Sequence, residues 1–133
     1  MGFIVLLHMN LFKMLSYLDF DYSEDEQGIG TWDAMACVIP DRVSAVAHEI
    51  SLVLTWATQS FTGQQGALDD GGDWDYDLQA QDDEGQPLVA NFDAERGQVT
   101  LATSPYGRTT VTLSLAGSPQ FGAAFEDAFG VVF

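Results

Sequence analysis

Residues 73–81, DWDYDLQAQ, alternate strictly between two kinds of side chain. The even-numbered positions are aromatic or aliphatic, and the odd-numbered ones are acids or amides. A period of two is typical of a β-strand that has one face on a core and the other in solvent. The stretch therefore predicts a strand in which Trp74 and Tyr76 are buried and Asp73, Asp75 and Asp77 are exposed.

Three more short β-rich runs follow this strand, and tight turns separate them. The runs are 87–93, 98–104 and 109–117, and the turns contain the glycine and polar residues that favour hairpins. In the last run, aliphatic residues again alternate with threonine and serine. The pattern predicts an antiparallel meander of four strands.

Two strand candidates precede these runs. Residues 17–24, YLDFDYSE, alternate in the same way, which predicts a strand with Asp19 and Asp21 on its outer face. Residues 31–40, TWDAMACVIP, form a second candidate, which ends at its proline. The single cysteine, Cys37, excludes an intramolecular disulfide, and its apolar surroundings in the sequence predict a buried thiol.

The clearest helix is expected over residues 41–61. Asp41 is a candidate N-cap, and apolar residues then recur at spacings of three and four. This stripe predicts that Val46, Ile50 and Leu54 are buried.

A second, shorter helix is expected over residues 118–129. Ser118 and Pro119 are residue types favoured at a helix start, and Gly130 is one favoured just beyond a helix end. Three phenylalanines stand four residues apart and are expected in the core: Phe121, Phe125 and Phe129.

The order of these elements predicts a single α+β domain over residues 1–133. We expect an antiparallel sheet of about five to six strands, with one long helix (about 41–61) and a short C-terminal helix (about 118–129) packed on it. Met9 or Met14 could be the true start, and residues 1–13 are considered as a possible N-terminal extension.

The charge of the chain limits its partners. Twenty acidic residues against four basic ones give a formal net charge of −16. Such a field repels nucleic acid and anionic membranes and attracts basic proteins, so we expect no nucleic acid, no membrane and a basic protein partner. The apolar run at 3–7 is too short to span a bilayer and lacks the flanks of a secretion signal, which favours a cytoplasmic, bacterial-type protein.

Thirteen of the twenty acids lie in two short segments, five within 19–26 and eight within 69–84. Counted from Asp73, acids fall at the third, fifth and twelfth places of a calcium-loop pattern. The sixth place, which needs glycine, is Leu78, so we expect a strand and no calcium site. The two segments leave open one alternative, a shared metal site of Asp19, Asp21, Asp75 and Asp77.

No sequence feature singles out a catalytic pair or a cofactor site. Two histidines cannot build a zinc cluster, no Gly-x-Ser-x-Gly elbow is present, and the glycines follow no phosphate-loop pattern. We therefore expect no cofactor and favour a binding protein over an enzyme.

The favoured hypothesis is a non-enzymatic acidic binding module that engages a basic protein partner. Small acidic α+β proteins with inhibitor, immunity-protein or chaperone-like roles are similar to this chain in size and charge alone. The alternatives are a metal-dependent enzyme that uses aspartates of the acidic strands, and a small structural protein or homo-oligomer. The residues expected on the acidic partner-binding face are Asp19, Asp21, Asp73, Asp75 and Asp77.

Overall fold

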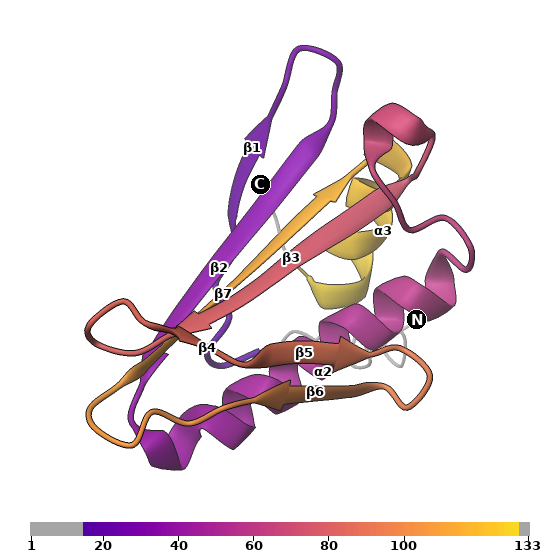
Figure 1. Ribbon diagram of the computed structural model, residues 1–133. Coiled ribbons are helices and arrows are strands. Elements are labelled where there is room, and N and C mark those ends of the chain that lie inside the picture. Colours follow the sequence, from indigo (N-terminus) through magenta and orange to yellow (C-terminus); the bar gives the residue numbers. More distant parts are fainter. Residues whose placement is uncertain (1–14, 131–133) are drawn as a thin grey trace.

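Five strands form the main antiparallel sheet, in the order β1-β2-β7-β3-β4 (Figure 1). The computed structural model describes residues 15–130, so the segment considered as an extension, 1–13, lies outside it. The predicted α+β class is confirmed. The strands of this sheet are β1 (Asp21–Glu24), β2 (Gly30–Val38), β3 (Trp74–Gln81), β4 (Pro87–Leu88) and β7 (Thr109–Gly117).

The remaining strands, β5 (Ala90–Asp93) and β6 (Gln98–Leu101), form a separate hairpin, so the predicted four-strand meander is wrong. The chain leaves the main sheet after β4, where the Val89 carbonyl accepts a hydrogen bond from the Ala102 amide at 2.9 Å. The hairpin then packs along α2 (Val43–Ser60). The central strand of the sheet is β7, which pairs with β2 on one side and β3 on the other and buries the aliphatic residues of its inner face.

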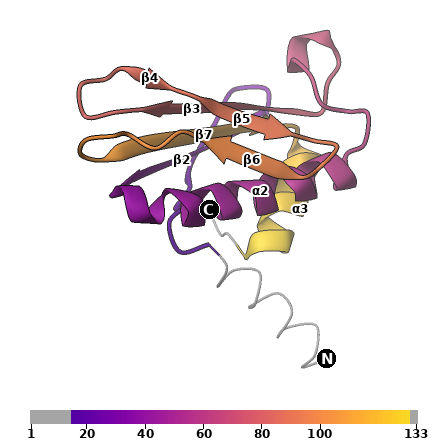
Figure 2. The same ribbon diagram turned by 60° about the horizontal axis from the view of Figure 1, so that its bottom comes forward.

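The long helix α2 and the shorter C-terminal helix cover the same face of the main sheet (Figure 2). A single 3-10 turn, η1 (Pro40–Arg42), precedes α2, whose N-cap is Arg42 without a side-chain hydrogen bond. The expected cap, Asp41, is therefore wrong, because Pro40 begins the 3-10 turn and α2 starts only after it. A second 3-10 turn, η2 (Leu68–Asp70), precedes β3. None of the described helices has the length and apolarity needed to cross a bilayer.

The C-terminal helix α3 (Pro119–Phe129) has the predicted caps. The Ser118 hydroxyl accepts a hydrogen bond from the Phe121 amide at 3.2 Å, which satisfies one of the free donors at the helix start. Gly130 follows the helix with a φ of +65°, a conformation that glycine adopts without steric cost.

Aromatic rings dominate the core between the sheet and the helices. The ring of Trp32 packs against those of Phe121 and Phe125 at centroid distances of 5.8 and 5.6 Å. All of the side chains predicted for the core from the two helices are buried there: Val46, Ile50, Leu54, Phe121, Phe125 and Phe129.

One carboxylate is buried beside this core. Glu49 of α2 is 4% exposed and accepts hydrogen bonds from the backbone amides of Ser16, Tyr17 and Leu18 at 2.8, 2.9 and 3.0 Å. Such charge-assisted bonds offset the cost of taking a carboxylate out of water. Glu49 therefore fastens the segment that leads into β1 onto α2.

Candidate functional site

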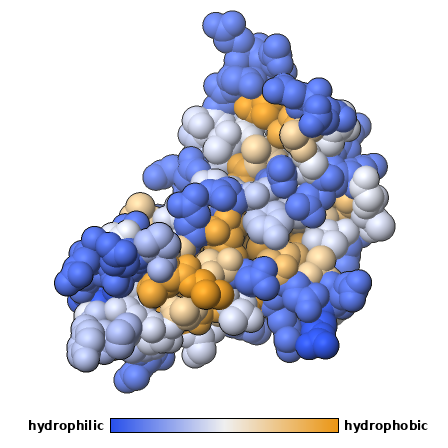
Figure 3. Space-filling model, viewed as in Figure 1, coloured by the Kyte–Doolittle hydropathy of each residue, from blue (hydrophilic) through white to orange (hydrophobic). Residues whose placement is uncertain are grey.

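The face of the main sheet that points away from the helices is open to solvent, and Figure 3 views it directly. On the central strand β7, Thr110, Thr112 and Ser114 point to this side, because they alternate with the buried residues of the core face. The strands on either side of β7 add their own outward residues. We call this surface the open face.

A row of side chains crosses the open face from β1 to β3. Strand pairing places Asp21 opposite Asp33, Asp33 opposite Ser114, and Ser114 opposite Asp77. The Ser114 hydroxyl donates a hydrogen bond to Asp33 Oδ1 at 2.5 Å. Neighbouring strands lie about 4.8 Å apart, so the row is about 14 Å long. We call Asp21, Asp33 and Asp77 the carboxylate row.

No cation neutralises the carboxylate row within residues 15–130. The ion pair that these residues contain, Arg96 with Asp93 at 3.8 Å, lies on the β5–β6 hairpin. Residues 43–95 contain neither lysine nor arginine. Like charges placed directly opposite each other destabilise a sheet, so the pairing of Asp21 with Asp33 costs stability.

The aspartates predicted on β3 differ in their exposure. Asp77 is exposed as predicted, but Asp73 and Asp75 are half-buried, so that part of the prediction is wrong. The reason is the loop before β3, which folds over its start: the Gly66 amide donates to the Trp74 carbonyl at 2.9 Å. The Asp75 carboxylate turns toward the backbone and accepts a bond from the Tyr76 amide at 2.9 Å.

The other predicted site residues lie outside the row. Asp19 is exposed but precedes β1, and Asp73 precedes β3. Of the five aspartates expected on a partner-binding face, the structure therefore aligns Asp21 and Asp77. It adds Asp33, which sequence reasoning missed although the same period of two in β2 places it outward.

Two tyrosines near acidic side chains, Tyr22 and Tyr76, have a pKa above the ordinary value of tyrosine. Burial and the charge of Asp75 raise the pKa of Tyr76. For Tyr22, burial, a hydrogen bond to Glu24 and the charges of Glu24 and Glu126 raise the pKa.

The two aromatic residues predicted to be buried on β3 differ in their exposure. Trp74 is buried as predicted, whereas Tyr76 is only half-buried.

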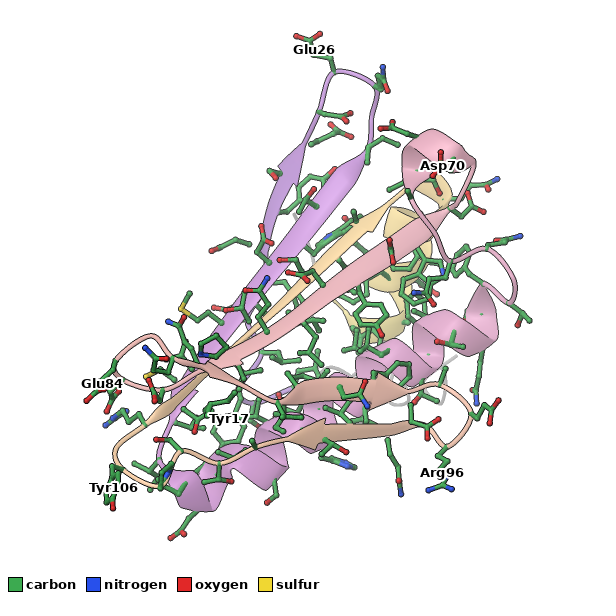
Figure 4. The ribbon with its side chains drawn as sticks, in the orientation of Figure 1. Tyr17, Glu26, Asp70, Glu84, Arg96 and Tyr106 are labelled. Carbon is green, nitrogen blue, oxygen red and sulfur yellow. The ribbon has the colours of Figure 1, made fainter. Side chains whose placement is uncertain are left out.

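The two acidic segments meet at one end of the sheet. Asp25 from the β1–β2 turn and Asp69 from η2 line one pocket of about 400 Å³. Figure 4 places Glu26 and Asp70 toward this end, and Glu84 at the opposite end of the sheet. Parts of both segments therefore lie at this end, and the β3–β4 turn carries the last acids of the second segment to the opposite end.

A neutral pocket of about 540 Å³ lies beside the carboxylate row. It extends from the open face over the outer edge of β3 toward β4, and Figure 3 shows apolar surface gathered between β3, β4 and β5. We call it the neutral pocket. Its walls include Met35, Thr112 and Gln79 on the open face and Leu88 and Ala90 at the edge.

Cys37 lies on the open face and is exposed, so the predicted buried thiol is wrong. The apolar run around it has a period of two, in which Ala34, Ala36 and Val38 point to the core. The residues between them must then point outward, whatever their hydrophobicity. The guanidinium of Arg108 donates to the Cys37 carbonyl at 3.5 Å.

The acidic residues do not form a metal centre within residues 15–130, where no three histidine, cysteine or acidic side chains are grouped to hold an ion. The stretch with the calcium-loop spacing is the strand β3, and Glu84 lies in the turn beyond its end. A strand holds alternate side chains on one side in a line, whereas a calcium loop must wrap them around an ion.

Comparison of the chain with protein-family models, with curated proteins and with solved structures found no match.

Proposed function

We propose that this protein is a non-enzymatic binding module whose open face engages a basic protein partner. The observation that carries the proposal is the carboxylate row, in which Asp21, Asp33 and Asp77 lie across four strands without a neutralising cation among residues 15–130. A row of like charges creates a strongly negative potential, which attracts and orients a positively charged surface.

Solubility is the competing explanation of the charge. Charge that serves solubility works from any exposed position, and it gains nothing from alignment on one face. Alignment has a cost, because Asp21 directly opposes Asp33. A cationic partner removes this repulsion when it binds, so the arrangement is favourable in a complex and unfavourable in the free protein.

The partner-binding mode expected from this surface is electrostatically steered association. Long-range attraction raises the rate of encounter, and added salt screens it. An inhibitor, immunity-protein or chaperone-like role uses such a surface to capture a basic protein quickly.

The experiment replaces the row and leaves the fold untouched. The protein is used to capture partners from its host, the bound proteins are identified by mass spectrometry, and the purified partner is tested by stopped-flow kinetics. We expect the triple variant Asp21→Asn, Asp33→Asn, Asp77→Asn to associate about tenfold more slowly at low salt. Asparagine keeps an oxygen that can accept the hydrogen bonds that Ser114 donates to Asp33 and Gln79 donates to Asp77. The variant also leaves Asp75 in place, whose carboxylate accepts a hydrogen bond from the Tyr76 amide in β3.

A matched control removes the same charge from other surfaces. Asp41→Asn, Glu95→Gln, Asp127→Asn changes the net charge equally at exposed positions of η1, the β5–β6 turn and α3. If the control slows association as much as the row variant does, the charge acts globally and the proposed binding face is wrong.

A further inference from the structure

We infer that the segment bound to the open face carries an aliphatic side chain two residues away from a cation. This inference rests on the proposed function and specifies the chemistry of the partner. It comes from the register between the carboxylate row and the neutral pocket.

The pocket begins one step along the sheet from the row. Met35, Thr112 and Gln79 form the adjacent row of the open face, two residues along β2, β7 and β3 from the carboxylate row. Two residues of a strand span about 6.7 Å. Gln79 Nε2 donates a hydrogen bond to Asp77 Oδ2 at 2.8 Å and so links the two rows.

The pocket suits an uncharged apolar group. None of its eleven lining residues carries a charge. Met35 is 65% exposed, so a ligand that covers it removes apolar surface from water. Leu78 and Leu88 are half-buried on the other side of the pocket. A cation placed here would lose hydration without gaining a carboxylate, whereas an aliphatic side chain loses nothing.

An extended segment matches this spacing. Its residues i and i+2 point to the same side, about 6.7 Å apart, which is the separation of the two rows on the open face. An arginine or lysine at i and a leucine, isoleucine or valine at i+2 therefore reach the carboxylate row and the neutral pocket together.

The opposite end of the pocket is also acidic, because Asp82, Asp83 and Glu84 lie in the turn between β3 and β4. These carboxylates bond to the backbone near the turn: Asp82 Oδ1 accepts from the Glu84 amide at 2.9 Å, and Asp83 Oδ2 accepts from the Arg108 amide at 3.0 Å. They stand in a turn, whereas the carboxylate row stands in the strand register of the open face. The spacing of i and i+2 in an extended segment therefore directs the cation to the row.

Three synthetic peptide amides test the inference by titration followed with amide chemical shifts of the full-length protein. The first is Arg-Ser-Arg-Ser-Leu-Ser-Ala, the second has serine in place of leucine, and the third has glutamine in place of both arginines. At low salt we expect the first to bind at least about tenfold more tightly than either of the others. The shifts should move at Met35, Thr112 and Gln79.

A matched pair of protein variants locates the aliphatic contact. Met35→Ser should abolish the advantage of the leucine peptide over the serine peptide. Val89→Ser should preserve it, because Val89 is as exposed, at 63%, but does not line the pocket.

The outcomes separate this inference from the proposed function. If the leucine and serine peptides bind equally and both lose affinity in the carboxylate-row triple variant, the acidic face binds cations and the aliphatic anchor is wrong. Shifts confined to other surfaces also overturn the inference, as does a lack of binding by every peptide. The function itself is judged separately, from the association kinetics of the captured partner.

Discussion

The two faces of β7 share one backbone and differ in every other respect. On one face Val111, Leu113 and Leu115 are buried under α2 and α3. On the other, threonine and serine lie between carboxylates and a neutral pocket. The inner face holds the fold together, because burial of apolar side chains is the main favourable term in folding. The outer face buries fewer side chains, so its residue types are less constrained by the core.

The largest difference between the faces should appear on replacing neighbouring residues of β7. Leu113→Ala should lower the free energy of unfolding by about 2–5 kcal/mol, because the buried side chain leaves a cavity. Thr112→Ala, on the open face, should cost less than about 1 kcal/mol. Urea denaturation of both variants measures the two values, and similar losses would contradict the division of roles.

The next largest effect should come from Glu49, the buried carboxylate of α2. Glu49→Ala should lower the free energy of unfolding by about 1–3 kcal/mol, because it leaves three backbone amides without their acceptor. His48→Ala, its exposed neighbour on α2, is the control and should be nearly neutral. Equal effects of the two replacements in thermal unfolding would show that the Glu49 contacts contribute nothing to stability.

A smaller effect of opposite sign is expected on the open face. Asp21→Asn should raise the free energy of unfolding by about 0.2–1 kcal/mol at low salt, because it removes the repulsion with Asp33. At about 1 M salt the gain should vanish, since charges are then screened within about 3 Å. Asp41→Asn serves as the reference for a general change in net charge, and a gain of equal size there would remove the special role of the row.

The smallest effect should be that of Cys37. Cys37→Ser should change the free energy of unfolding by less than about 0.5 kcal/mol, because the side chain is exposed. A maleimide should label the thiol of the folded protein at nearly the rate found in denaturant. Strong protection of the thiol in the folded state would mean that this end of the open face is covered.

The sequence by itself determined the local structure. The strand at 73–81 and the helix at 41–61 were predictable because alternation and helical spacing depend only on residues close in sequence. The caps of α3 at Ser118 and Gly130 were predictable for the same reason. The same alternation in β2 also places Asp33 and Cys37 on the outer side of the strand. The apolar residues around Cys37 led instead to the prediction of a buried thiol.

Only the tertiary structure decided which of these outward residues became neighbours. Asp21 and Asp77 are 56 residues apart in sequence, and they share a row because β2 and β7 lie between their strands. The half-burial of Asp75 depends on the loop that folds over β3, and the neutral pocket depends on where the chain leaves the sheet after β4. Strand order results from the packing of whole buried faces against α2 and α3, and the short-range periodicity of a strand carries no information about its partner.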